Sequence, residues 1–207
     1  MQPFVYDGLP SRVVFGQGTL AQLRQELEHL GCSRALVLAT PQQHEQASRV
    51  LELLGDKGVG VYADAVMHTP VEVTKHALQV VKELNVDCTV AIGGGSTIGL
   101  GKAIALRTGL PQIAIPTTYA GSEMTPILGE TSDGIKTTQR TLDVLPETVI
   151  YDVDLTLTLP AVMSGTSGIN AIAHAVEALY ARDCNPVIAL MAEEGIAALA
   201  RTLPVIA

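Results

Sequence analysis

The 207-residue sequence predicts an α/β fold, in which an N-terminal domain with a mostly parallel sheet and helices on both faces precedes the start of an all-helical C-terminal domain. Between residues 19 and 118, apolar runs typical of buried strands alternate with segments of helical period, as in sheets whose parallel strands are joined by crossover helices. From about residue 155 every segment has helical period. With 47% hydrophobic and 16% charged residues, the chain can bury a large core. We expect an α/β domain over residues 1–154 and the beginning of a helical domain over residues 155–207.

The predicted elements follow in order along the chain. FVYDGLPSRVVFG, at residues 4–16, alternates around an Asp-Gly pair and predicts an opening hairpin. ILGETSDGIKTTQRT, at residues 127–141, combines alternation with turn residues and predicts a second hairpin around residues 132–134. Apolar runs predict strands at residues 35–40, 59–65, 87–95, 112–118 and 147–152. Apolar residues at helical spacing predict helices at residues 19–31, 44–55, 71–85 and 96–109.

Charge and cysteine content narrow the class of protein. The formal net charge of -8 argues against nucleic acid or an anionic membrane as a partner. Cys32, Cys88 and Cys184 are widely spaced and form no CxxC motif, which is typical of reduced cysteines in a cytosolic protein. The N-terminus lacks the charged and apolar regions of a secretory signal, and no stretch is apolar for long enough to span a membrane. The sequence therefore predicts a cytoplasmic protein.

Three consecutive glycines join a buried strand to a helix in TVAIGGGSTIGLGKAIAL. Glycine removes the side chains that would keep a phosphate away from main-chain N–H groups, and the helix N-terminus adds a positive dipole end. The segment is not a GxGxxG fingerprint, because Ile98 stands at the last glycine position, and it is not a P-loop, because Ser96 and Ala103 replace required residues. A plain tight turn is the alternative. We favour a diphosphate site, since ligands of open α/β sheets bind where the strands end. Its residues would be Gly93, Gly94, Gly95 and Ser96.

A second polar loop, PTTYAGSEMTP, follows the next strand. We expect its hydroxyl groups to reach the same edge of the sheet as the glycine turn, because the carboxyl ends of parallel strands lie together. Neutral hydroxyls suit the ribose, amide and phosphate oxygens of a dinucleotide. The hydroxyl-bearing residues are Thr117, Thr118, Tyr119, Ser122 and Thr125, and we expect the first four of them to bind the cofactor.

Asn170 and His174 stand four residues apart in GTSGINAIAHAVEALY. In a helix both side chains project from one face about one turn apart, which is the spacing of a helix-borne metal pair. A divalent cation would favour a carboxylate where this chain has an amide, so the pair should bind metal weakly. The alternative is an ordinary core helix whose histidine is satisfied by a hydrogen bond.

Four segments, in their order and spacing, resemble the iron-containing alcohol dehydrogenase family: GGGSTIGLGKAIAL, IPTTYAGSEMTP, LPETVIYD and SGINAIAHAVEALY. The resemblance implies that residues 1–154 form a dinucleotide-binding, or nucleotide-binding, domain with a dehydroquinate-synthase-like fold. It implies that residues 155–207 begin a helical substrate and catalytic domain, with the active site in the cleft between the two. It also implies a longer protein, with further metal-binding histidines beyond Ala207. Typical members have an aspartate where this chain has Gly99, and an aspartate metal ligand where it has Asn170. These departures are similar to those of a branch that reduces maleylacetate.

The resemblance also implies a reaction and roles for residues. That branch reduces the carbon–carbon double bond of maleylacetate to 3-oxoadipate with NADH or NADPH, in the degradation of aromatic compounds. We expect His174 to stabilise or protonate the enolate oxygen and Asn170 to orient substrate or histidine, with no metal required. The family places a lysine near the cofactor, which matches Lys136. Lys136 and Arg140 are alternatively substrate-carboxylate anchors or solvated hairpin charges. Thr40, at the end of the second strand, carries no negative charge that would exclude NADPH.

The expected partners are a small-molecule dicarboxylate substrate and a second copy of the chain in a homodimer, with no nucleic acid and no membrane. Three other functions remain open at this point. They are a metal-dependent alcohol dehydrogenase of the same family, a dehydroquinate-synthase-like lyase that uses NAD transiently, and a nucleotide-binding fragment without catalysis.

Overall fold

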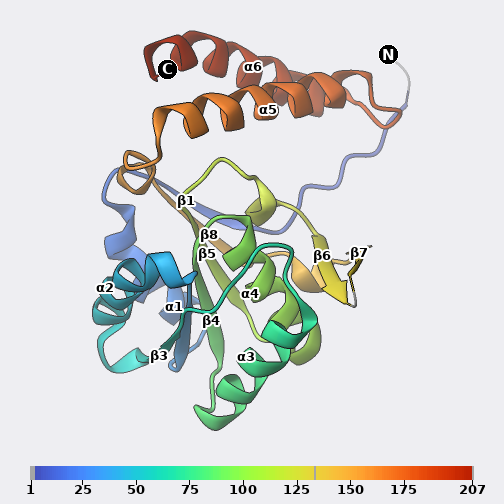
Figure 1. The fold of residues 1–207 in the computed structure, drawn as a ribbon. Coiled ribbons are helices and arrows are strands. Elements are labelled where there is room, and N and C mark those ends of the chain that lie inside the picture. Colours follow the sequence, from blue (N-terminus) through green and yellow to red (C-terminus); the bar gives the residue numbers. More distant parts are fainter. Residues whose placement is uncertain (1–2, 133, 207) are drawn as a thin grey trace. The chain divides into compact units, whose positions relative to one another are not determined.

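A computed structural model describes residues 3–132 and 134–206 (Figure 1). These residues form two compact units. The first, called the sheet unit below, comprises Ser11–Thr117 and Gly121–Leu157. The second, called the helical unit, comprises the described residues among 1–10, 118–120 and 158–207.

The sheet unit is built on a six-stranded sheet in the order β1-β8-β5-β4-β2-β3, and every neighbouring pair is parallel. The prediction of a mostly parallel sheet is confirmed. The strands are β1 (Arg12–Gly16), β2 (Ala35–Leu38), β3 (Gly58–Tyr62), β4 (Cys88–Gly93), β5 (Gln112–Pro116) and β8 (Thr148–Asp152).

The predicted opening hairpin is wrong. Among the described residues before β1, none is in a strand, and β1 pairs in parallel with β8, with Arg12 opposite Thr148 and Gly16 opposite Asp152. Alternation of apolar and polar residues reports that one face of a strand is buried, but it does not identify the partner strand. The same pattern therefore fits a hairpin and this edge strand equally well.

Helices cover both faces of the sheet, and successive residues of a strand pack alternately against the helices of one face and of the other. In β2, Ala35 and Val37 belong to the core cluster that includes residues of α1 (Leu23–His29) and α2 (His44–Leu54). Leu36 and Leu38, on the opposite face, belong to the cluster that includes residues of α3 (Val71–Glu83) and α4 (Gly95–Thr108). Short 3-10 helices span Thr19–Gln22 (η1), Pro41–Gln43 (η2), Gly55–Lys57 (η3), Ser122–Met124 (η4), Leu142–Val144 (η5) and Val153–Thr156 (η6).

The second predicted hairpin is confirmed: β6 (Ile127–Ser132) pairs antiparallel with β7 (Ile135–Arg140). Asp133, at its turn, lies outside the described residues. The hairpin is fixed to α4 by an ion pair of 3.0 Å between Arg107 and the buried Glu130. Leu128 packs against Ala103 in a small separate core.

The chain reverses its direction across the sheet between β2 and β4. The connection after β2 leads outward to β3, whereas the connection after β4 leads the other way to β5. In open α/β sheets such a switch point leaves a crevice at the carboxyl ends of the two strands, and ligands bind there. The crevice of this sheet is bordered by the residues that follow Leu38 and Gly93.

The helical unit contains α5 (Ala161–Tyr180) and α6 (Pro186–Ile206), which lie side by side (Figure 1). Gly168 of α5 faces Leu203 of α6, so the two helices approach closely where a side chain is missing. Asn185 caps α6, because its side-chain oxygen accepts hydrogen bonds from the backbone N–H groups of Val187 (3.1 Å) and Ile188 (3.2 Å). Among the described helices, none is long and apolar enough to cross a membrane.

Candidate coenzyme site

The glycine turn follows β4 at the switch point. Gly93 has φ +149°, a backbone conformation that L side chains rarely adopt, and Gly94 is the N-cap of α4. A Cβ at Gly93 would lie 2.6 Å from Oγ1 of Thr97 and 2.7 Å from Oε1 of Gln43. Glycine is therefore required at residue 93 by both backbone angle and space.

The first turn of α4 presents main-chain donors at this point. The N–H groups of Thr97 and Ile98 bond to the carbonyl of Gly94, at 3.1 and 3.2 Å. Those of Gly95 and Ser96, the first residues of the helix, have no helical carbonyl to bond, and the helix dipole adds a positive field. The buried hydroxyl of Thr97 has no hydrogen-bond partner among the described residues. Free donors without obstructing side chains fit a phosphate group.

Neutral polar side chains line the β2 side of the crevice. Nε2 of Gln43 donates to Oγ1 of Thr117 (3.1 Å), and Oγ1 of Thr40 donates to Oε1 of Gln43 (3.2 Å). Thr117 also donates its backbone N–H to the carbonyl of Gly93 (3.1 Å). These three side chains carry no charge that would repel a phosphate.

On the other flank of the α4 N-terminus lies a pocket of about 340 Å³. Its walls come from the turn after β3, from α4, from η4 and from the β6–β7 hairpin. It brings together four residues that the sequence predicted for the cofactor site, namely Gly95, Ser96, Ser122 and Lys136. The Lys136 side chain crosses Gly129, where an added Cβ would lie 3.2 Å from its Cε. Arg140 is not among the residues that line this pocket.

The turn after β3 supplies three pocket residues that the sequence did not reveal, namely Met67, His68 and Thr69. His68 has φ 67° and Thr69 has φ 43°, so two consecutive non-glycine residues adopt the left-handed conformation. The carbonyl of Thr69 accepts a hydrogen bond from the backbone N–H of Thr131 (3.3 Å), and its side chain rests on Gly99. The unusual glycine at residue 99 was the only sequence signal for this contact.

The remaining predicted residues belong to the helical unit. Thr118 and Tyr119 group with it, and Asn170 and His174 lie on α5. Asn170 is exposed, and the His174 side chain is 71% exposed with its Nδ1 3.7 Å from the carboxylate of Glu177. The two side chains therefore do not belong to the buried core of the described chain.

The described residues do not by themselves fit an iron site. No group of three or more histidine, cysteine, aspartate or glutamate side chains that could hold an ion occurs in the described part of the chain. Asn170 and His174 offer one amide and one imidazole, with no carboxylate between them, whereas divalent iron favours a set that includes anionic oxygen.

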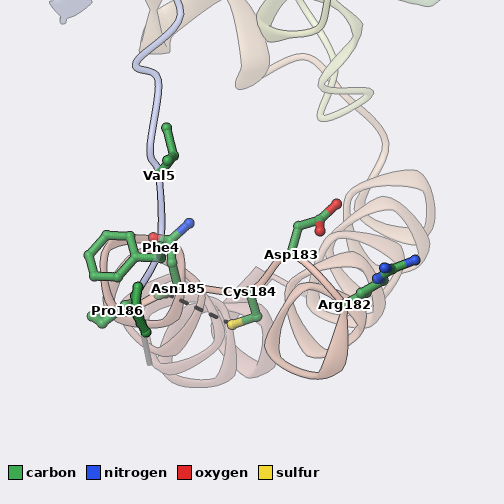
Figure 2. Close-up of a pocket in the computed structure, with 8 residues that line it drawn as sticks. Phe4, Val5, Arg182, Asp183, Cys184, Asn185 and Pro186 are labelled. Atoms are coloured by element: carbon green, nitrogen blue, oxygen red, sulfur yellow. Dashed lines mark hydrogen bonds between the residues drawn. The ribbon is translucent and has the colours of Figure 1, made fainter. Parts of the chain in front are cut away.

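A further pocket, of about 480 Å³, lies within the helical unit. Figure 2 shows the segment that carries Phe4 and Val5 passing the connection between α5 and α6, where Arg182 and Asp183 lie. None of the residues predicted for the functional site lines it.

The parallel sheet, its switch point and the glycine turn at the start of α4 together define a doubly wound α/β domain, a class of fold that commonly binds nucleotides at such a switch point. Residues 10–153 match the model of the family described as iron-containing alcohol dehydrogenase. The chain belongs to the iron-containing alcohol dehydrogenase family.

Two relatives and two solved structures illustrate the similarity. The chain is 58% identical to a maleylacetate reductase of Rhizobium sp. (strain MTP-10005), covering 99% of this chain and 58% of the relative. It is 61% identical to a maleylacetate reductase of Sphingobium indicum, covering 98% and 57%. The structure of maleylacetate reductase from Agrobacterium tumefaciens matches with a TM-score of 0.98 and 58% identity, covering 100% and 59%. That of an iron-containing alcohol dehydrogenase from Corynebacterium glutamicum matches with a TM-score of 0.94 and 44% identity, covering 100% and 58%.

The chain thus spans less than two thirds of the length of each of these proteins. The recognition of the family and the prediction of the fold class are confirmed.

Proposed function

We propose that this chain forms the coenzyme-binding part and the first part of the catalytic domain of a reductase that converts maleylacetate to 3-oxoadipate with NADH or NADPH. The observation that carries the proposal is the 58% identity, over 99% of the chain, to a relative named maleylacetate reductase. The glycine turn at the switch point supports it independently, because such a site suits the diphosphate of a dinucleotide. Residues 1–154 would form the coenzyme domain and residues 155–207 the beginning of the helical catalytic domain.

The diphosphate would rest on the main-chain N–H groups of Gly94, Gly95 and Ser96. Dinucleotide-binding sheets hold the adenosine ribose near the end of the strand next to the phosphate turn, which here is the β2 end with Thr40 and Gln43. The nicotinamide half would then occupy the pocket on the opposite flank. The coenzyme-binding residues that we propose are Gly93, Gly94, Gly95, Ser96, Thr117, Thr118, Tyr119, Ser122 and Lys136.

Coenzyme selectivity would be weak. Enzymes selective for NAD commonly carry an acidic side chain at the end of the second strand, which binds the ribose hydroxyls and repels a 2′-phosphate. In this chain Thr40 occupies that place and hydrogen-bonds to Gln43. Both NADH and NADPH should therefore serve.

The bound dihydronicotinamide would supply the hydride, and the chain would handle the charge and the proton. Reduction of a double bond conjugated to a ketone builds negative charge on the ketone oxygen as an enolate. We propose that His174 donates a hydrogen bond or a proton to that oxygen, and that Asn170, one turn away on α5, orients substrate or histidine. This pair would act without a bound metal, because the amide of Asn170 contributes no negative charge to a cation.

The test is turnover by the full-length protein, followed as loss of reduced-nicotinamide absorbance on addition of maleylacetate. We expect activity with either coenzyme, unchanged by a chelator, and a loss of kcat in His174→Ala. His76→Ala, on α3 of the sheet unit, is the matched control and should retain activity. Activity that a chelator removes and iron or zinc restores would overturn the metal-free part. Full activity in His174→Ala would overturn the role of His174.

The alternative is a metal-dependent alcohol dehydrogenase, favoured by the 44% identity to the iron-containing enzyme of Corynebacterium glutamicum. Iron-dependent oxidation of simple alcohols, without turnover of maleylacetate, would support it. The homodimer and the cytoplasmic location remain predictions.

A further inference from the structure

Lys102 is a fully buried lysine in the middle of α4, with 0% of its surface exposed. Its Nζ donates hydrogen bonds to the backbone carbonyls of Ser122 (2.5 Å), Thr125 (2.6 Å) and Ile127 (2.9 Å). The hydroxyl of Thr125 lies 3.1 Å from the same atom and donates in turn to the carbonyl of Ser122 (3.0 Å). One ammonium group thus joins both ends of the segment 122–127 to the helix.

Burying an ammonium group costs several kcal/mol unless other groups replace its water. Here three carbonyl oxygens do so, and each is itself a group that would be costly to leave without a partner. Burial lowers the pKa of Lys102 to about 8, and the nearby carboxylate of Glu123 opposes that shift. Glu123 is buried as well, and its Oε1 accepts a hydrogen bond from the hydroxyl of Tyr151 (2.8 Å). The segment is therefore held by α4 from one side and by β8 from another.

The segment has little regular structure of its own. It contains the single 3-10 turn Ser122–Met124 and reaches the first residue of β6 at Ile127. Few backbone bonds within the segment fix its path, so the contacts to Lys102 determine where its carbonyls lie. Without the ammonium group, the carbonyls of Thr125 and Ile127 would lose its hydrogen bonds, and the carbonyl of Ser122 would keep only those from Thr125. The segment would then no longer be fixed to α4 at this point.

Ser122 and Ile127 connect this network to the candidate coenzyme pocket. Both residues bond to Lys102 through their carbonyls, and both line the pocket on the flank of the α4 N-terminus. The same helix contributes Ser96 and Gly99 to that pocket. Lys102 therefore fixes one wall of the pocket to the helix that forms another wall, although it does not line the pocket itself.

We infer that Lys102 is a positioning residue for the coenzyme, whose ammonium group holds Ser122 and Ile127 at the separation that the nicotinamide half requires. The inference rests on the proposed function only for the identity of the ligand. It goes beyond that function by giving a role to a residue that contacts neither coenzyme nor substrate.

The test is Lys102→Met in the full-length protein, with Lys75→Met as matched control. Lys75 is also a helical lysine, but it is exposed and forms a surface ion pair with Glu72. We expect the dissociation constant for NADH, measured by titration calorimetry without substrate, to rise about tenfold or more in Lys102→Met, since small displacements of binding groups have large effects. Hydrogen exchange should accelerate in the segment 122–127 of that variant. Lys75→Met should change neither quantity.

A purely structural role would lower the melting temperature of Lys102→Met without moving the dissociation constant or the local exchange, and that result would overturn the inference. If Lys102→Met does not fold, hydrogen exchange of the wild-type protein tests the inference instead. Its backbone amides in segment 122–127 should exchange slowly before coenzyme is added, and exchange as fast as in an unstructured peptide would refute the positioning role. If the full-length protein binds neither NADH nor NADPH, the proposed function fails, and the exchange measurement still tests whether Lys102 holds the segment.

Discussion

Replacing Gly99 with alanine should destabilise the sheet unit, and the reason is its contact with Thr69. Gly99 lies in α4, where alanine normally stabilises a helix relative to glycine by about 1 kcal/mol. A Cβ at this position would lie 2.5 Å from Oγ1 of Thr69. Ordinary van der Waals contact begins at 3.4 Å, so the two atoms would be 0.9 Å too close. Thr69 is buried and its backbone is bonded to Thr131, so it cannot withdraw freely.

The size of the effect follows from two opposing contributions. Overpacking a filled site costs about 1–3 kcal/mol, which exceeds or offsets the gain in helix propensity of about 1 kcal/mol. In a Thr69→Ala background the obstructing hydroxyl is absent, so Gly99→Ala should then stabilise the protein. The coupling energy between the two sites should therefore be about 1–3 kcal/mol.

The assay is a double-mutant cycle on the full-length protein, with the free energy of unfolding taken from urea denaturation. Thr69→Val keeps a methyl group where the hydroxyl was and should not relieve the clash, which makes it the matched control. Gly101→Ala, where the nearest atom to an added Cβ is 3.3 Å away, should be tolerated. A coupling energy below about 0.5 kcal/mol would refute the claim that Thr69 excludes a side chain at residue 99.

Three further predictions concern the coenzyme and pH. Gly93→Ala should weaken NADH binding at least about tenfold, because the added Cβ would push against the base of the phosphate turn. The control Gly109→Ala, at φ +70° with open space around it, should lose stability but keep its affinity for NADH. Equal NADH affinities of the two variants would contradict the prediction. Burial lowers the pKa of Lys102 from 10.5 to about 8, so between these pH values the unfolded state binds more protons than the folded state. As pH rises through that window, the free energy of unfolding of the wild type, measured by urea titration, should increase by up to about 3 kcal/mol relative to that of Lys102→Met. A decrease relative to Lys102→Met would contradict the prediction. Thr40→Asp should lower kcat/KM for NADPH at least about tenfold, since a carboxylate there repels the 2′-phosphate, and should leave kcat/KM for NADH nearly unchanged. If the ratio of the two kcat/KM values does not change, coenzyme selectivity is set by other residues.

The order of strands and helices was predictable because each element carries its own periodic signal. Buried parallel strands read as apolar runs, and Gly55 and Gly109 mark helix ends at positive φ. The glycine turn was predictable for the same reason, since its residues are consecutive. The partner of β1 was not, because one strand pattern fits several pairings.

The parts of the site that the sequence missed depend on contacts between distant residues. Lys102 meets carbonyls 20 to 25 residues further along the chain, and nothing near it in the sequence reveals them. Every residue carries a backbone carbonyl, so the sequence does not show which carbonyls accept hydrogen bonds from Lys102. The folded structure is needed to identify them. The left-handed turn at His68 and Thr69 lacks the glycine or asparagine that usually signals such a conformation. The roles of Asn170 and His174 remain predictions.

The parallel pairing of β1 with β8 has a consequence for biosynthesis. Arg12 is paired with Thr148, 148 − 12 = 136 residues later, and the carboxylate of Asp152 accepts hydrogen bonds from the backbone of Gly18 and Leu20. At about 5–20 residues per second, a ribosome needs roughly 7–27 s to make the intervening chain. During that interval the first strand of the nascent polypeptide has an open edge, which makes it a site where chaperones or neighbouring chains could pair.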